Sequence, residues 1–145
     1  LSRVEKSSKV DGNFDWKEFF NANGKLTHIE IDESGDGKPD TNQYYNSLDE
    51  LIRLEVDSTK NGKIDRWSYF RGNSVLDRTS FDTKGDGKPD QWQFYHDDQI
   101  LKKAEYDTNG DGKADRWEHF NSAGKLEKTE MDRNFDGKID MTQKK

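Results

Sequence analysis

The sequence has no cysteine, only two prolines and no long hydrophobic segment. Without cysteine there is no disulfide bond and no thiolate metal site, so a metal ion would need oxygen ligands. No apolar run approaches the roughly 18 residues of a membrane-spanning helix, and no apolar signal-peptide core is present, so we expect no transmembrane segment. The first residue is Leu1 rather than Met, which is compatible with a leader or lipid anchor removed from the full-length protein.

Hydrophobic residues are also scarce, at 28% of the chain against 37% for charged residues. This balance favours disorder or a weak core. The eight Phe, five Tyr and four Trp argue against disorder, because aromatic residues favour β-strands and each buries a large area. The net charge is −6 and no block of Lys and Arg stands apart from acidic residues, so we expect cations rather than nucleic acid as partners.

What the sequence does contain is a repeat. The segments DESGDGKPD, DSTKNGKID, DTKGDGKPD, DTNGDGKAD and DRNFDGKID begin 25 residues apart, at Asp32, Asp57, Asp82, Asp107 and Asp132. A sixth, degenerate copy starts at Ser7 and ends in VDGNFD at Asp15. We therefore predict one repeat domain over residues 1–145, with repeats that start near residues 7, 32, 57, 82, 107 and 132.

Each repeat continues in the same way after its Asp-rich segment. An aromatic-rich run ends at position 14 with Phe or Tyr, namely Phe20, Tyr45, Phe70, Tyr95 and Phe120. A short polar link such as residues 121–124 follows, and a second run ends with an apolar residue just before the next Asp. Two short runs around such a link have the size of a β-hairpin and are too short for two stable helices. The predicted fold is all-β: a solenoid-like tandem array of about six 25-residue β-hairpin repeats.

The aromatic residues are predicted to form most of the core. Positions 11 and 13, such as Trp67 and Tyr69, lie on one face of a strand. Position 14 breaks this alternation, so we expect a β-bulge or burial on both faces there. Neighbouring hairpins would bury these rings, although a carbohydrate-stacking surface is the alternative.

The Asp-rich segments are predicted to bind Ca²⁺. Positions 1, 3, 5 and 9 supply side-chain oxygens, position 7 supplies its carbonyl, and Gly at position 6 permits a sharp turn. Several oxygen ligands in flexible geometry suit Ca²⁺ better than Mg²⁺, and clustered carboxylates repel one another unless a cation neutralises them. We expect about three to five bound ions. The alternative is that these segments are ordinary Asx/Gly turns.

The copies differ in how completely they supply ligands. The predicted ligands are Asp32, Ser34, Asp36, Lys38 and Asp40; Asp57, Thr59, Asn61, Lys63 and Asp65; Asp82, Asp86, Lys88 and Asp90; Asp107, Asn109, Asp111, Lys113 and Asp115, with Glu118 at position 12; and Asp132, Asn134, Asp136, Lys138 and Asp140. The copy at Asp107 is the best. Lys84 at position 3 must turn away and leave its place to water. The copy at Asp57 has only two carboxylates and should bind weakly, so Asp57→Ala is expected to change little. With only Asp11 and Asp15 left, the first copy should bind no ion.

The segments DTNGDGKAD and DESGDGKPD resemble the calcium loops of EF-hands, dockerins, thrombospondin type 3 repeats and the FG-GAP blades of integrin-like propellers. This chain is similar to the kind in which a strand follows the loop. The Glu that an EF-hand carries at position 12 is replaced in most copies, by Gln43, Ser68, Gln93 and Gln143, which disfavours a helix-loop-helix. The aromatic hairpin over residues 120–126 is similar to the YD-like and MORN-like hairpins of bacterial surface and envelope proteins.

We expect no enzymatic activity. The histidines His28, His96 and His119 occupy different positions of their repeats, no free carboxylate pair is evident, and phosphate-binding glycine loops are missing. Two hypotheses remain. In the first, calcium rigidifies an extracytoplasmic spacer or binding surface in the periplasm, on the cell surface or in a secreted protein, with a protein or cell-envelope partner. In the second, the loops form a calcium sensor or buffer that changes conformation to engage a partner.

Overall fold

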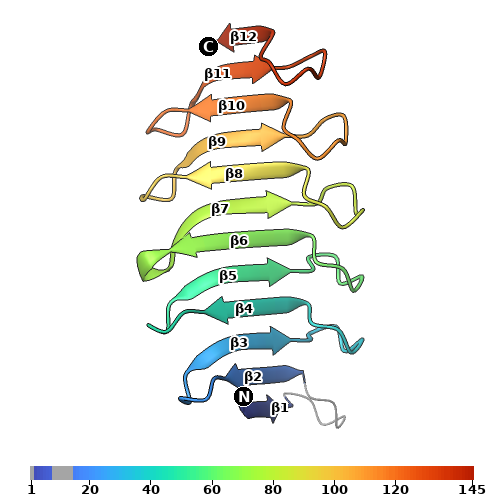
Figure 1. The fold of residues 1–145 in the computed structure, drawn as a ribbon, viewed down its shortest axis with the longest axis vertical. Helices are drawn as coiled ribbons and strands as arrows, with labels where there is room; N and C mark the ends of the chain where they lie inside the picture. Colours follow the sequence, from blue (N-terminus) through green and yellow to red (C-terminus); the bar gives the residue numbers. More distant parts are fainter. Residues whose placement is uncertain (1, 8–14) are drawn as a thin grey trace. The chain divides into compact units, whose positions relative to one another are not determined.

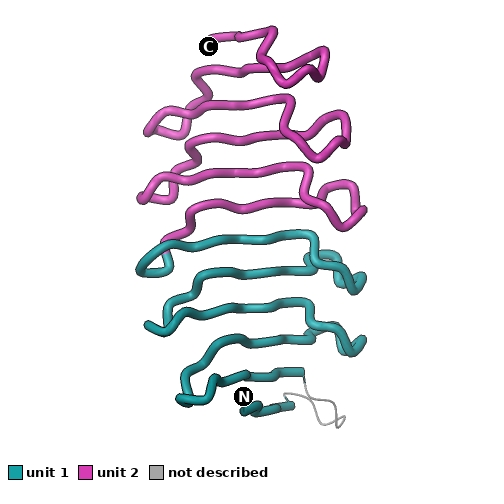
Figure 2. Tube along the Cα trace, in the orientation of Figure 1, with its two compact units in different colours: residues 1–74 teal, residues 75–145 magenta. Residues whose placement is uncertain are grey.

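The computed structural model describes residues 2–7 and 15–145. Most of the degenerate first loop, including Asp11, lies outside these residues, so the prediction that it binds no ion is not addressed. The chain divides into two compact units, Leu1–Ser74 (unit 1) and Val75–Lys145 (unit 2), shown in Figure 2. Each unit is described separately below.

Both units consist of antiparallel strands that follow one another in chain order (Figure 1). Unit 1 contains β1 (Ser2–Lys6), β2 (Trp16–Phe20), β3 (Leu26–Ile31), β4 (Thr41–Tyr45), β5 (Leu51–Val56), β6 (Arg66–Arg71) and a short 3-10 turn, η1 (Gly72–Ser74). Unit 2 contains β7 (Val75–Phe81), β8 (Gln91–Tyr95), β9 (Leu101–Tyr106), β10 (Arg116–Phe120), β11 (Leu126–Met131) and β12 (Met141–Lys144). The predicted all-β array of consecutive hairpins is confirmed.

The two kinds of connection lie at opposite ends of the strands in each unit. The polar links join the two strands of one hairpin, whereas the Asp-rich segments join one hairpin to the next (Figure 1). Strands reverse direction at every connection, and the two kinds alternate along the chain. The described Asp-rich loops of a unit therefore lie side by side at the same end of the strands.

The predicted irregularity at position 14 is confirmed as a β-bulge. The register shifts between Phe19 and Phe20, between Tyr44 and Tyr45, between Phe94 and Tyr95, and between His119 and Phe120. In β3, for example, Leu26 faces Phe20 and His28 faces Phe19, so Thr27 is the extra residue. Its hydroxyl donates to the Phe19 carbonyl at 3.0 Å. The extra residue thus lies in the partner strand, and position 14 keeps to the same face as positions 10 and 12 by regular alternation.

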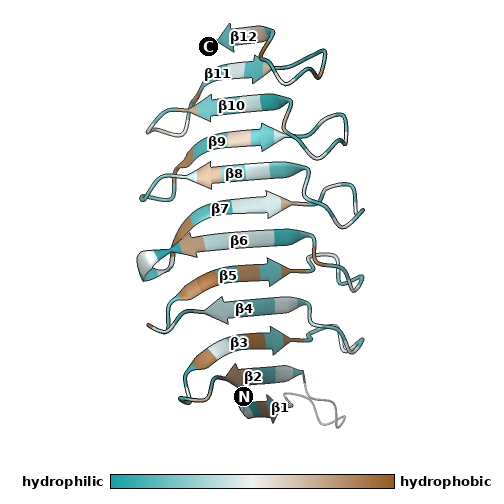
Figure 3. Ribbon diagram, in the orientation of Figure 1, coloured by the Kyte–Doolittle hydropathy of each residue, from teal (hydrophilic) through white to brown (hydrophobic). Residues whose placement is uncertain are grey.

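The prediction that the aromatic residues form a buried core is wrong. Among the described residues, only Ile29 and Ala104 are fully buried hydrophobic side chains, and every Trp and Tyr is half-buried. Each unit is a single sheet in which strands contact their sequence neighbours, so a ring is covered by its neighbours on the same face and not by a second layer. Hydrophilic residues accordingly interrupt the hydrophobic ones along the strands (Figure 3).

A row of stacked side chains crosses unit 1 instead of a core. The rings of Phe19 and His28 are 4.6 Å apart, and those of His28 and Tyr44 are 4.8 Å apart, nearly parallel in both cases. The Arg53 guanidinium continues the row, 5.3 Å from the Tyr44 centroid and 5.9 Å from the Tyr69 centroid. These contacts combine ring stacking with cation–π attraction. Because the faces of the middle rings are taken up by one another, they are not free to stack on a sugar.

In unit 2, the positions that form the stacked row of unit 1 are occupied by other residues. Lys103 lies 4.6 Å from the Phe94 centroid. The ammonium of Lys103 also pairs with Glu105 at 2.7 Å, two residues further along the same strand. Lys128 and Glu130 form the equivalent pair at 2.8 Å. Half-buried rings and charged side chains therefore share one face, which accounts for the high charge content of the strands.

Asn side chains shape several of the short turns. The Asn121 side-chain oxygen accepts the N–H groups of Ala123 and Lys125, both at 3.0 Å. Asn21 makes the same two contacts in the first hairpin, to Asn23 at 2.9 Å and Lys25 at 3.0 Å. Gly124 completes the turn with a φ of 72°, a left-handed conformation that costs glycine little.

We predict that Asn121→Ala lowers the free energy of unfolding by about 1 kcal/mol, because two backbone N–H groups lose their acceptor. Urea denaturation would measure the loss. Ser122→Ala, which changes an exposed side chain of the same turn, is the matched control. Equal losses in the two variants would show that the Asn side chain does not hold the turn.

Candidate metal centre

Backbone hydrogen bonds close each Asp-rich loop at its base. The N–H of position 9 donates to the carbonyl of the residue before position 1, as from Asp40 to Ile31 at 2.8 Å and from Asp115 to Tyr106 at 2.9 Å. Successive loops within a unit are linked as well. Asp57 N–H donates to the Asp40 carbonyl at 2.8 Å, and Asp132 N–H donates to the Asp115 carbonyl at 2.8 Å. The loops therefore form a hydrogen-bonded row at one end of the strands in each unit.

The carboxylate at position 1 is the hub of each of the five loops that the structure describes. In all five copies it accepts the N–H of the glycine at position 6, from Gly37 at 2.9 Å, Gly62 at 2.6 Å, Gly87 at 2.6 Å, Gly112 at 2.7 Å and Gly137 at 2.7 Å. Further donors come from positions 4 and 5, for example Gly110 at 2.6 Å to Asp107. These glycines have positive φ, 87° at Gly112, as the sharp turn requires.

Four of the five hub carboxylates, Asp57, Asp82, Asp107 and Asp132, are buried. Asp57 is only 2% exposed and Asp107 5% exposed. Burial raises the pKa of Asp57, but hydrogen bonds from the N–H groups of Asn61 and Gly62 outweigh it and leave the pKa below its usual value. The same balance of burial and backbone donors lowers the pKa of Asp32, Asp82 and Asp107. The loops therefore keep a negative charge at their centre.

Positions 3 and 5 lie close to the hub and are exposed. The Ser34 hydroxyl is 3.2 Å from the Asp32 carboxylate, and the Thr59 hydroxyl is 3.3 Å from the Asp57 carboxylate. Each position 5 side chain accepts the N–H of position 7; the distances are 2.8 Å at Asp36, 2.9 Å at Asn61, 2.9 Å at Asp86, 2.8 Å at Asp111 and 2.9 Å at Asp136. The position 3 side chain thus lies beside the hub in loops 32–40 and 57–65, and the position 5 N–H donates to the hub in loops 57–65, 82–90 and 132–140.

Position 9 makes a different set of contacts, which the sequence analysis missed. Asp65, Asp90 and Asp115 accept hydroxyl hydrogen bonds from position 2, from Ser58 at 2.8 Å, Thr83 at 2.8 Å and Thr108 at 2.7 Å. Among the described residues, no group of three or more His, Cys, Asp or Glu side chains is arranged to hold a metal ion. The Ser or Thr at position 2 was a visible signal for this contact.

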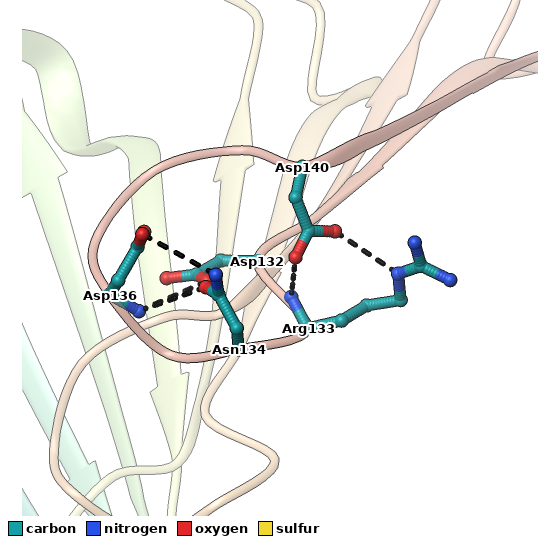
Figure 4. A network of polar contacts seen from close by, with 5 residues as sticks. All are labelled: Asp132, Arg133, Asn134, Asp136 and Asp140. Atoms are coloured by element: carbon teal, nitrogen blue, oxygen red, sulfur yellow. Dashed lines mark hydrogen bonds and ion pairs between the residues drawn. The ribbon is translucent and has the colours of Figure 1, made fainter.

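The last loop shows both arrangements in one view. In Figure 4, Asp132, Asn134 and Asp136 point toward one another, with Asn134 Nδ2 3.4 Å from the Asp136 carboxylate. Asp140 instead accepts from Arg133, at 3.0 Å from both its backbone N–H and its Nε. That hydrogen bond from the Arg133 side chain lowers the pKa of Asp140. Positions 1, 3 and 5 are therefore the oxygen donors that this conformation leaves available.

The side chains of Glu118 and Lys84, which the sequence analysis also considered, make contacts outside their own loops. Glu118 accepts from Tyr106 at 3.0 Å and pairs with Arg116, so both of its carboxylate oxygens are engaged on the sheet. We therefore leave Glu118 out of the ligand set proposed below. Lys84 turns away from its own loop, as predicted, and its ammonium donates to the Asp107 carbonyl at 3.1 Å.

A groove of about 300 Å³ separates the last two loops of unit 2. Asp111 and Trp117 line it together with Asp132 and Phe135. Phe135 is 50% exposed and has a φ of 59°, at position 4, where three other loops have glycine. This conformation is strained for a bulky residue. Acidic side chains of both loops therefore face the same groove.

We predict that Asp57→Ala lowers the free energy of unfolding by about 2 kcal/mol even with chelator present, because three backbone N–H groups lose a buried acceptor. This differs from the expectation based on weak ion binding. Asp36→Ala, which removes an exposed carboxylate that accepts one N–H, is the control. Chemical denaturation of both variants in EGTA gives the comparison, and equal losses would mean that Asp57 is not a structural hub.

No protein-family model matches the chain, and no curated protein matches it. A chain in the crystal structure of accessory secretory protein 1, 2 and 3 in Streptococcus pneumoniae is similar, with a TM-score of 0.53 and 16% sequence identity. The likeness covers 81% of this chain and 20% of that chain, so this chain spans about a fifth of its length. At this identity it shows a shared fold alone. Within the described residues, no helix is long and apolar enough to cross a membrane.

Proposed function

We propose that the chain is a calcium-binding, non-enzymatic repeat module in which ions in the Asp-rich loops rigidify the hairpin array, which presents a surface to a protein or cell-envelope partner. The observation that carries this proposal is the hub contact from position 1 to position 6, present in all five described loops. At Asp107 and Asp132 it leaves lone pairs of the hub carboxylate available, because each accepts two N–H hydrogen bonds and a carboxylate accepts up to about four.

The donor set fits a hard cation. Carboxylate, amide and hydroxyl oxygens are the ligands that Ca²⁺ prefers, and the exposed positions 3 and 5 leave the ion access to water ligands. Loops 32–40, 107–115 and 132–140 supply two carboxylates and a third side-chain oxygen from these positions. The carbonyls of Lys38, Lys113 and Lys138 would complete those sets. Position 9 would join only if it released the hydrogen bonds that it accepts from positions 2 and 3.

The positions of the loops between hairpins favour the structural hypothesis over the calcium-sensor hypothesis. Each loop connects two hairpins and is hydrogen-bonded at its base to the strand before it. An ion there would stiffen the connection in a sheet that lacks a second layer. A sensor would need two alternative packings. Loops with low calcium affinity would suit an environment outside the cytoplasm, where calcium is abundant. The fold likeness to a chain in a structure of accessory secretory proteins is compatible with a protein partner.

Calcium should raise the melting temperature of the chain, because it binds the folded loops and not the unfolded chain. At about 10 mM calcium and a Kd on the order of 10⁻⁴ to 10⁻³ M, each occupied loop contributes about 1.4 to 2.7 kcal/mol. Differential scanning calorimetry in calcium, in magnesium and in EGTA would measure this, with a smaller effect of magnesium. An unchanged melting temperature in calcium and EGTA would refute the structural role.

Asp111→Asn separates binding from folding at a single loop. The Asn oxygen still accepts the Lys113 N–H, so stability in EGTA should change by less than about 0.5 kcal/mol. Loss of the charge should weaken calcium binding at this loop by at least about tenfold. Isothermal titration calorimetry and native mass spectrometry would count the ions.

Asp98→Asn is the matched control, because Asp98 is also an exposed Asp that accepts an N–H two residues ahead, at 3.2 Å from Ile100, but it lies in a hairpin turn. If both variants bind the wild-type number of ions with the wild-type affinity, loop 107–115 is not a site.

A further inference from the structure

Lys84 connects two neighbouring loops of unit 2. It occupies position 3 of loop 82–90, where the other loops have Ser, Thr or Asn. Its backbone N–H donates to Asp82 at 3.2 Å, which keeps its backbone in the loop. Its side chain leaves the loop, and the ammonium donates to the Asp107 carbonyl at 3.1 Å. A positive charge from one loop is therefore held against the hub residue of the next.

The ammonium lies beside the oxygen donors of loop 107–115. A Cβ placed on Gly110 would be 3.7 Å from Lys84 Nζ, so the ammonium also lies against position 4 of that loop. Gly110 N–H donates to the Asp107 carboxylate at 2.6 Å. Burial raises the pKa of the Asp107 carboxyl, but the N–H groups of Gly112 and Gly110 and the charge of Lys84 bring it below its usual value. Loop 107–115 thus has a cation of its own chain next to its hub.

In unit 1, Lys38 also lies against a glycine of the next loop, Gly62, but Lys60 is placed differently. Lys60 of loop 57–65 pairs with Glu33 of loop 32–40 at 3.0 Å, and both side chains are largely exposed. The positive charge of Lys60 is neutralised there by a carboxylate that is not among the predicted ligands. Lys84, in contrast, donates to a backbone carbonyl, so its charge acts on the loop itself.

We propose that Lys84 is a tethered cation that stabilises loop 107–115 without an ion and lowers the affinity of that loop for calcium. The inference rests on the proposed function. Two positive charges repel in proportion to the inverse of their separation, and near a protein surface the interaction is partly screened. Loop 107–115 is the most complete loop by sequence, but it is then not the tightest site. Relative to loop 107–115, loops 32–40 and 132–140 should bind calcium more tightly than a comparison of the sequences alone indicates.

Lys84→Met tests the proposal, because Met keeps most of the side-chain length but adds neither charge nor an oxygen ligand. Lys102→Met is the control; it removes one positive charge from an exposed position of β9, in the same unit. Calcium titrations followed by ¹⁵N NMR assign occupancy to each loop, through the amides of Gly110 and Gly112 for loop 107–115 and those of Gly85 and Gly87 for loop 82–90. Melting in EGTA measures stability without the ion.

We expect calcium affinity at loop 107–115 to rise roughly three- to tenfold in Lys84→Met and less than about twofold in Lys102→Met. The difference should shrink in high salt, and Lys84→Met should melt earlier in EGTA. Unchanged affinity, or an equal rise in both variants, would overturn the tethered cation while leaving calcium binding intact. If calcium moves no loop amide of the folded wild type, the proposed function fails, and the role of Lys84 fails with it.

Discussion

The hydrogen bond from the glycine N–H at position 6 to the carboxylate at position 1 is the interaction on which the rest of the structure depends. It turns the chain back on itself after every second strand, so that the next hairpin starts beside the last. A buried carboxylate is costly unless hydrogen bonds compensate it, and several N–H groups do so at Asp57 and Asp107. The loop is therefore a folded element with a charged centre rather than a flexible connection.

The sheets that these loops connect explain the unusual composition. A single-layer sheet buries no face completely, so it has no use for a large aliphatic core. Stability has to come from contacts within the layer: the backbone hydrogen bonds of the strands, rows such as Phe19, His28 and Tyr44, and cations over rings such as Lys103 over Phe94. Charged side chains can share the face with aromatic rings because both remain half exposed. This is why 37% charged residues are compatible with a folded chain.

Local pattern predicted the hairpins, the turns and the β-bulge, because each depends on residues a few positions apart. The 25-residue spacing placed the loops, and the break in alternation at position 14 located the bulge at Phe20 and Tyr45. Features that depend on rotamers or on the number of layers were missed. Asp115 bonds to Thr108, Glu118 engages Arg116 and Tyr106, and the rings stay half-buried. None of these follows from residue type and spacing alone.

The loops divide their work between positions 1 and 9 on one side and positions 3 and 5 on the other, and this division bears on how the copies diverge. Positions 1 and 9 fold the loop through backbone and position 2 donors, whereas positions 3 and 5 are exposed in all five described loops. A substitution at position 3 or 5 therefore removes a ligand without removing the hub. Loop 57–65 has Asn61 at position 5 and loop 82–90 has Lys84 at position 3, yet both keep the hub contact at 2.6 Å. Because folding and ligand supply rest on different side chains, a loop can lose affinity for a cation and still connect its hairpins.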